Sequence, residues 1–212
     1  MITITFLIVI IAYSIYAIYD RNIMAKYLFH PYSIYHFKEH YRFLTHAFIH
    51  GDWMHLAFNC IALYSFGLPI ENKLFGNPNF FDPKIGKILY ILLFTGGIYA
   101  ASLTEYFRNK NNPNYTSLGA SGAISSILFC YIIVSPTSWI SFFFFPLQGW
   151  IAGILLLSVS YVLIRRKRLG LYTDNISHES HFWGAIYGIA FIAVVKPMFI
   201  KHFVLEIAAI FH

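Results

Sequence analysis

Long apolar runs separated by short polar segments dominate this chain. Runs of about 18 or more apolar residues are long enough to cross a lipid bilayer as helices, and we identify six of them. They occupy residues 2–19, 53–70, 88–107, 117–134, roughly 145–164 and 181–200. The pattern predicts an all-α, polytopic membrane protein in which residues 1–212 form a single membrane-embedded domain.

The first and last runs need an interpretation of their own. No Lys or Arg precedes the first run, and it is longer than the apolar stretch of a signal peptide, so we interpret it as a membrane anchor. Pro197 interrupts the last run and predicts an end or a kink there. The remaining residues 201–212 are apolar but too short to cross again, which favours a position along the membrane interface.

Composition agrees with this interpretation, because 58% of the residues are hydrophobic and only 11% are charged, whereas soluble domains carry about 25% charged residues. The net charge of +6 comes from basic residues in short loops, with the largest cluster at 165–168. Such clusters suit lipid phosphates, so we expect membrane lipids as partners and no nucleic acid. Cys60 and Cys130 lie inside apolar runs and predict helix packing.

Four polar residues lie near the starts of alternate runs. His55 and Asn59 are in the second run, Ser121 is in the fourth, and His181 opens the sixth. Antiparallel spans place these starts at one membrane face, and a rise of about 1.5 Å per residue leaves each residue within roughly 10 Å of it. Polar groups at that depth are tolerated where they line a water-filled cavity. The sequence therefore predicts one polar site, open toward the loops that precede these runs.

The residue types at this site suit acyl transfer. Ser121 is the candidate nucleophile and His181 the candidate general base that accepts its proton. Gly119 and Gly122 flank Ser121 and leave room for a substrate carbonyl to approach. We place Glu179 in the loop before the last run, off the helical face of His181, so we predict a catalytic dyad rather than a triad.

The same site contains candidate hydrogen-bond donors for an oxyanion. His55 and Asn59 are four residues apart, which places them on one helical face. Together with the backbone N–H of Ser121, they are expected to hold the oxyanion of a tetrahedral intermediate. Gly184 and Gly188 form a small-xxx-small pattern, which is typical of closely packed membrane helices.

These residues resemble the rhomboid family of intramembrane serine proteases, and the likeness extends from about Tyr41 to Gly188. The matching motifs are Gly119-Ala120-Ser121-Gly122, His181-x-x-Gly184-x-x-x-Gly188, His55-x-x-x-Asn59 and Tyr41-Arg42. The resemblance implies a six-transmembrane-helix, rhomboid-like bundle. It also implies cleavage of transmembrane or membrane-proximal segments of other membrane proteins, without a metal or other cofactor.

The resemblance also implies supporting roles and exposes two departures. Arg42 is expected to tie down the long first loop by hydrogen bonds to backbone carbonyls, and Glu71 stands where the family has a structural Glu. Tyr41 replaces a frequent Trp. Ser125 stands where many members have an aromatic residue stacked on the catalytic histidine. We therefore expect another nearby aromatic ring to hold His181.

Orientation and location are less directly specified. The first, third and fifth loops carry more Lys and Arg than the remaining loops, and the positive-inside rule would place the polar site on the cytoplasmic side. The resemblance implies the opposite orientation, with the site open to the outer side, and we follow the resemblance. We expect a multi-pass protein of the bacterial plasma membrane.

Two other classes of function remain open. A histidine cluster precedes and enters the second run, at His30, His36, His40, His46, His50 and His55. It would suit a metal transporter or a membrane metalloenzyme, although the spans contain no Asp and only Glu105 among acidic residues near an end. The second class is a client-binding, rhomboid-like pseudoprotease. Such proteins lack the Ser or the His of the dyad, and this chain has both.

Overall fold

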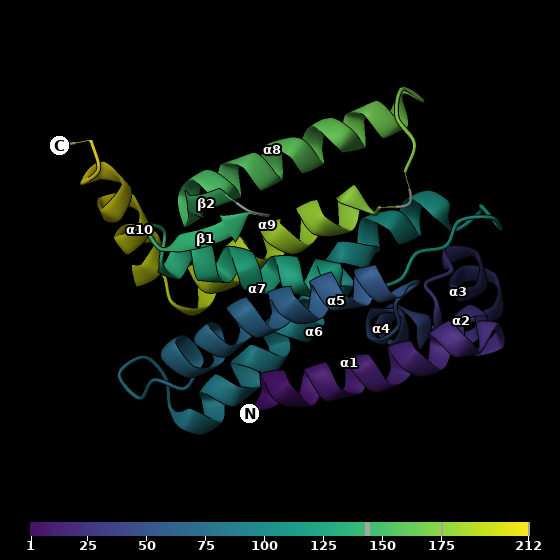
Figure 1. The fold of residues 1–212 in the computed structure, drawn as a ribbon, viewed down its shortest axis with the longest axis horizontal. Helices are drawn as coiled ribbons and strands as arrows, with labels where there is room; N and C mark the ends of the chain where they lie inside the picture. Colours follow the sequence, from purple (N-terminus) through teal and green to yellow (C-terminus); the bar gives the residue numbers. More distant parts are fainter. Residues whose placement is uncertain (143–144, 175, 212) are drawn as a thin grey trace.

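The computed structural model describes residues 1–142, 145–174 and 176–211, so Phe143, Phe144, Asn175 and His212 lie outside the described residues. Helices packed along one another form an elongated bundle (Figure 1). The main helices of the bundle are α1 (Ile2–Tyr19), α5 (Trp53–Ala62), α6 (Pro83–Asn109), α7 (Ser121–Val134), α8 (Gly149–Arg168) and α9 (His178–Val195). The remaining elements are α2 (Arg21–Tyr27), α3 (Pro31–Phe37), α4 (Arg42–Thr45), η1 (His46–Phe48), η2 (Leu63–Gly67), η3 (Ile70–Phe75), β1 (Trp139–Phe142), β2 (Phe145–Gln148) and α10 (Met198–Ala208). The predicted all-α fold class is confirmed.

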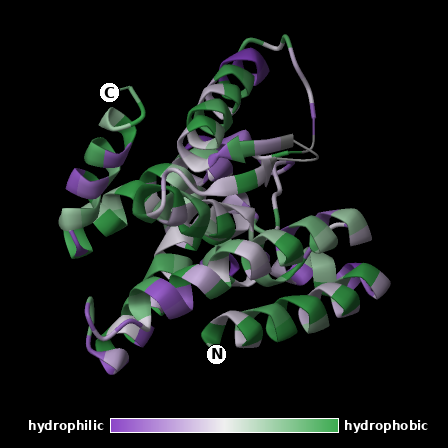
Figure 2. Ribbon diagram, turned by 60° about the vertical axis from the view of Figure 1, so that its left-hand side comes forward, coloured by the Kyte–Doolittle hydropathy of each residue, from purple (hydrophilic) through white to green (hydrophobic). Residues whose placement is uncertain are grey.

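Several helical segments are long and apolar enough to cross a membrane. Among the described residues, four qualify by length and composition, namely α1, the stretch Trp53–Phe75, α6 and α8. Helices α9 and α10 qualify together but are bent by 111° relative to each other. Figure 2 shows that α1, which starts at the N-terminus, is hydrophobic over nearly all its length. Its outward side chains, such as Ile8 and Tyr16, are exposed to the surroundings, as expected of a helix that faces lipid.

The second span is longer than predicted and continues through η2 and η3 to Phe75. Both segments are wide helical turns, in which the hydrogen bonds reach five residues back. Pro69 lies between them and has no N–H to donate. The widened turns keep the helix continuous past this residue and extend the span five residues beyond the predicted end at 70.

Helix α6 is also longer than the predicted run 88–107. The side chain of Asp82 accepts hydrogen bonds from the backbone N–H groups of Lys84 (2.9 Å) and Ile85 (3.3 Å), and Pro83 occupies the first helical position. An N-cap followed by proline is a strong helix start. Polar capping residues therefore extend this helix beyond its apolar stretch.

Helix α7 lies at the centre of the bundle and begins later than predicted. The expected run was 117–134, whereas the helix has 14 residues and starts at Ser121. Gly119 has a φ of +110°, which a right-handed helix does not accommodate, and its N–H bonds to the carbonyl of His46 at 2.9 Å. A 14-residue helix is about 21 Å long, shorter than the roughly 30 Å hydrocarbon core. Ser121 therefore starts a helix that is too short to cross the membrane alone.

The fifth predicted run, 145–164, is wrong at both ends. Strands β1 and β2 form an antiparallel hairpin in which Trp139 pairs with Gln148, and α8 follows at Gly149 and continues to Arg168. Residues 145–148 of that run belong to β2 instead of a helix, because short apolar runs do not distinguish strands from helices. The basic cluster 165–168 forms the last turn of α8, where positive charge complements the helix dipole.

The last predicted run, 181–200, is interrupted by proline as expected. Helix α9 begins at His178, ends at Val195, and is followed by the 111° bend into α10. Glu179 therefore lies in the first turn of α9 rather than in the preceding loop. The tail forms α10, which contacts α7 and α9 near the hairpin (Figure 1).

Candidate active site

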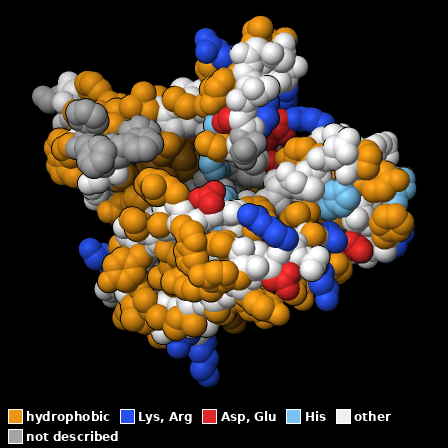
Figure 3. All heavy atoms as spheres, turned by 45° about the vertical axis from the view of Figure 1, so that its right-hand side comes forward, with side chains coloured by type: hydrophobic (Ala, Val, Ile, Leu, Met, Phe, Trp, Pro, Cys, Tyr) orange, Lys and Arg blue, Asp and Glu red, His pale blue; other side chains and the backbone are white. Residues whose placement is uncertain are grey.

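The four polar residues singled out in the sequence line one cavity. The cavity has a volume of about 1250 Å³, and Ser121, His181, His55 and Asn59 all contribute to its wall. Figure 3 looks toward a hollow at whose depth histidine side chains are visible. The predicted convergence of these residues at one site is confirmed by their shared cavity. Their catalytic roles remain predictions.

Helices α7 and α9 approach each other backbone to backbone beside this cavity. A Cβ atom on Gly184 would lie 2.1 Å from the carbonyl oxygen of Gly122, and one on Gly188 would lie 2.1 Å from that of Ser126. Only glycine permits such a separation, as expected for the small-xxx-small pattern. The contact places the start of α9, with His181, beside the start of α7, with Ser121.

The described residues show no hydrogen bond between Ser121 and His181. Catalytic hydrogen bonds are often long before substrate binds. The ring next to His181 belongs to His178, with centroids 6.3 Å apart and the planes nearly perpendicular. This is an edge-to-face arrangement. His178 in turn bonds through Nε2 to Oδ2 of Asp174 at 2.7 Å, so an aromatic ring that is itself anchored lies beside His181. That this ring orients His181 stays a prediction.

His55 contributes another part of the cavity wall. Its ring packs against the ring of His50, with centroids 4.8 Å apart, and the first turn of its helix is capped by Asp52, which accepts from the His55 N–H at 2.8 Å. Asn59 donates from Nδ2 to the His55 carbonyl at 2.9 Å. An amide nitrogen carries two hydrogens, so a second N–H of Asn59 is available to a ligand.

His50 connects this wall to the backbone next to Ser121. It is fully buried; its Nε2 accepts from the Ala120 N–H at 3.4 Å, and its Nδ1 contacts Ser14 Oγ at 2.8 Å. Because Nε2 accepts, the neutral ring carries its proton on Nδ1 and donates it to Ser14. Burial, followed by the proximity of His55, lowers the pKa of His50 to about 3. The ring is therefore a fixed, neutral bridge between α1 and the start of α7.

The first loop is folded against the bundle through Arg42. Its Nη1 donates to the carbonyls of Ala25 (2.8 Å) and Leu28 (2.9 Å), and its Nε donates to Glu39 Oε2 at 2.5 Å. The predicted hydrogen bonds to backbone carbonyls are confirmed. The Arg42 carbonyl accepts from His46 Nδ1 at 2.8 Å. Burial lowers the pKa of His46 to about 4.

Glu71 lies away from the cavity. Its carboxylate accepts from the backbone N–H groups of Ile2 (2.6 Å) and Thr3 (2.8 Å) and so caps the N-terminus of α1. A carboxylate at this position satisfies free N–H groups and complements the helix dipole. The geometry is that of a structural residue.

A buried polar cluster beside the cavity, whose Ser117, Ser177 and Ser180 line its wall, was missed in the sequence. Glu105 of α6 is only 2% exposed and accepts from Ser117, Ser177 and Ser180. Burial, and then the Glu105 carboxylate, raise the pKa of Tyr115 in the neighbouring loop. An ionisable residue inside an apolar run is a signal of function, and that signal was present at position 105.

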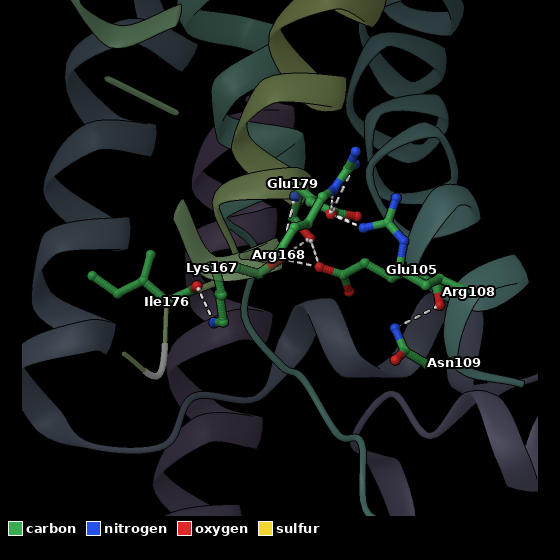
Figure 4. A network of polar contacts seen from close by, with 9 residues as sticks. Glu105, Arg108, Asn109, Lys167, Arg168, Ile176 and Glu179 are labelled. Atoms are coloured by element: carbon green, nitrogen blue, oxygen red, sulfur yellow. Dashed lines mark hydrogen bonds and ion pairs between the residues drawn. The ribbon is translucent and has the colours of Figure 1, made fainter. Parts of the chain in front are cut away.

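Next to this cluster, a network of charges joins the ends of three helices (Figure 4). Glu179 of α9 pairs with Arg108 of α6 and with Arg168 Nη2 of α8, the latter at 3.2 Å. Lys167 of α8 donates to the carbonyls of Asp174 and Ile176 in the following loop. The ends of α6 and α8 and the start of α9 are therefore linked electrostatically.

The histidines considered for metal binding make other contacts in the fold. Within residues 1–142, 145–174 and 176–211, no group of three or more His, Cys, Asp or Glu side chains is arranged to hold a metal ion. His46 and His50 are instead hydrogen-bonded to Arg42 and Ser14.

Fold and site together define a polytopic membrane protein with a cavity at the starts of three helices, lined by Ser121, His181, His55 and Asn59 among other residues. The model of the Rhomboid domain family matches residues 38–198. The chain therefore belongs to the rhomboid family. Because this is a family of intramembrane serine proteases, membership supports a protease-like function.

Curated relatives agree with this assignment. The chain is 28% identical over 170 residues to Rhomboid-related protein 1 of Caenorhabditis elegans, an alignment that covers 77% of this chain and 42% of the relative. It is 30% identical over 153 residues to Rhomboid protein 1, mitochondrial, of Saccharomyces cerevisiae (68% and 39%), and 30% over 164 residues to RHOMBOID-like protein 12, mitochondrial, of Arabidopsis thaliana (74% and 47%).

The chain thus spans less than half the length of these relatives. A multi-pass membrane protein is supported by the family and the helices. Two of these relatives carry mitochondrial names, so the comparisons give no support to the expected bacterial plasma membrane.

Proposed function

We propose that this chain is an intramembrane serine endopeptidase that uses a Ser121–His181 dyad to cleave transmembrane or membrane-proximal segments of membrane proteins. The observation that supports it most is the single cavity lined by Ser121, His181, His55 and Asn59. Ser121 is the first residue of α7. The first N–H groups of a helix have no intrahelical acceptor, so they are available to a developing negative charge.

The chemistry follows from these positions. The Ser121 Oγ attacks the scissile carbonyl carbon while His181 accepts the hydroxyl proton. The resulting oxyanion accepts hydrogen bonds from the Ser121 N–H, His55 and Asn59. Collapse of the tetrahedral intermediate breaks the C–N bond, and His181 donates its proton to the leaving amine. A water molecule, deprotonated by His181, then hydrolyses the acyl-enzyme and regenerates Ser121.

The substrate must present an accessible carbonyl to a cavity below the membrane surface. A helical segment hides its carbonyls in intrahelical hydrogen bonds, so the substrate has to unwind locally. We propose small residues and helix breakers around the cleavage site. Removing helix breakers from a model transmembrane substrate should lower the cleavage rate, and an unchanged rate would count against this requirement.

The test uses purified protein in proteoliposomes with a model transmembrane substrate and a fluorophosphonate label. Ser121→Ala and His181→Ala should abolish both cleavage and labelling. Two control variants, Ser125→Ala and His202→Ala, should remain active. Ser125 lies one turn further along the same cavity-lining helix, and His202 is an exposed residue on α10. Cleavage at the wild-type rate by Ser121→Ala would refute the proposed role of Ser121 as the nucleophile.

The same preparation discriminates between the other classes. A client-binding pseudoprotease would bind membrane proteins without labelling at Ser121. A metalloenzyme or transporter would contain stoichiometric metal and would not label. Reporter fusions to the loop after Arg168 measure which side of the membrane the site faces, and a cytoplasmic signal would overturn our outward orientation.

A further inference from the structure

The carboxylate of Glu105 lies in a buried position, where a charge is energetically unfavourable. It lies near the end of α6 and is 2% exposed. Burying an unpaired carboxylate is strongly unfavourable, so a buried acidic side chain is usually surrounded by hydrogen-bond donors. The described residues provide those donors from segments far apart in the chain.

The donors come from the two segments that lead into the dyad. Ser117 Oγ donates to Oε2 at 3.0 Å and belongs to the strand-like stretch that precedes Ser121. Ser180 Oγ donates to Oε1 at 3.1 Å and immediately precedes His181. Ser177, whose hydroxyl also accepts from the Ser180 N–H at 3.2 Å as the N-cap of α9, donates to the same oxygen. The Glu105 carboxylate is thus hydrogen-bonded both to the segment that leads into Ser121 and to the segment that leads into His181.

The contact reaches the dyad through Ser180. A Cβ on Gly122 would lie 3.4 Å from the Ser180 carbonyl oxygen and 3.7 Å from its Cβ, so Ser180 packs directly against the residue that follows Ser121. Any movement of Ser180 changes the separation of α7 and α9 at this point. The position of His181 relative to Ser121 is therefore coupled to the hydrogen bonds of Glu105.

We propose that Glu105 is a positioning residue of the Ser121–His181 dyad, and that its carboxylate fixes the start of α9 against the start of α7. The inference rests on the proposed function. This role of Glu105 explains how His181 is held in place without an acidic residue hydrogen-bonded to its ring nitrogen. Small displacements of catalytic groups lower rates steeply, by about a hundredfold per 1 Å. Loss of the Glu105 hydrogen bonds is therefore expected to lower kcat rather than substrate binding.

The experiment compares Glu105→Gln with Glu206→Gln in full-length protein reconstituted in proteoliposomes. Glu206 on α10 accepts one hydrogen bond from Thr137, at 3.0 Å, and provides a matched carboxylate-to-amide control. The measurements are kcat and KM for the model transmembrane substrate, the labelling rate of Ser121 by the fluorophosphonate, and the thermal unfolding midpoint. Glu105→Gln should lower kcat and the labelling rate about tenfold or more, with KM within twofold. Glu206→Gln should leave kcat, KM and the labelling rate within twofold.

Ser180→Ala keeps the carboxylate and removes one donor, which makes it a second test if Glu105→Gln does not fold. It should lower kcat several-fold, and the double variant should lose less than the product of the two single effects. Labelling of wild type combined with unchanged kcat in Glu105→Gln or Ser180→Ala would overturn this inference alone. A reduced unfolding midpoint with unchanged kcat would show a purely structural role and would also overturn it. Absence of labelling in wild type would overturn the proposed function and this inference together.

Discussion

The imidazole of His55 lies directly against the backbone of Gly119, where a Cβ atom would be 2.7 Å from Cε1 and 2.8 Å from Nε2 of the ring. Gly119 also has a φ of +110° and donates its N–H to the carbonyl of His46 at 2.9 Å. The glycine is thus required twice, for its conformation and for the space that His55 occupies beside Ser121.

Gly119→Ala should abolish the proposed proteolysis, because the new methyl group must displace His55 from its proposed oxyanion-binding position. The backbone strain alone costs about 1–2 kcal/mol. Gly170→Ala is the matched control, since Gly170 has a φ of +70° but no atom within 4 Å of a Cβ. It introduces a side chain at a positive φ without a steric contact, and it should retain activity. Equal activity in the two variants, measured as kcat in proteoliposomes, would contradict the role of the His55 contact.

The contact between α7 and α9 gives a second prediction. Gly184→Ala would place a Cβ 2.1 Å from the Gly122 carbonyl oxygen, so the helices must separate. We expect a loss of about 1–3 kcal/mol in unfolding free energy and loss of cleavage. Gly153→Ala on α8 is the control, because its Cβ would meet its nearest neighbours at an ordinary 3.4 Å. Steric trapping or denaturant unfolding measures both, and a stable, active Gly184→Ala would refute the close-packing interpretation.

The sequence was sufficient to place the polar residues at one end of the bundle, because span counting depends only on the apolar runs. It was not sufficient to find the start of α7, since the break at Gly119 depends on a hydrogen bond to His46, which is remote in the chain. The donors of Glu105 were equally hidden. Ser117 and Ser180 become its neighbours only when α6 and α9 pack together.

Arg42 provides a third prediction. It bridges two backbone carbonyls and Glu39, and a lysine keeps the charge but has a single nitrogen that cannot reproduce this geometry. Arg42→Lys should lower the unfolding free energy by about 1–3 kcal/mol. Arg21→Lys, at an exposed position on α2, should change it little. Equal stability of the two variants would show that the first loop is held by other contacts.

The buried histidines of the first loop give a pH prediction. Burial lowers the pKa of His46 to about 4 and, with the proximity of His55, that of His50 to about 3, from an ordinary value of 6.5. Below pH 6.5 the unfolded chain therefore binds protons that the folded protein excludes. Stability is fully present above pH 6.5 and falls as the pH decreases toward the folded pKa values. The slope is about 1.4 kcal/mol per pH unit for each histidine.

His50→Gln should make the decline between pH 6.5 and 5 shallower by about one histidine's contribution, because the glutamine oxygen can accept from the Ala120 N–H without titrating. His202→Gln on exposed α10 should leave the slope as in wild type. Unfolding free energies measured at several pH values in one detergent compare the three proteins directly. An unchanged slope in His50→Gln would mean that this ring is protonated in the folded state, and the neutral bridge from Ser14 to Ala120 would then be wrong.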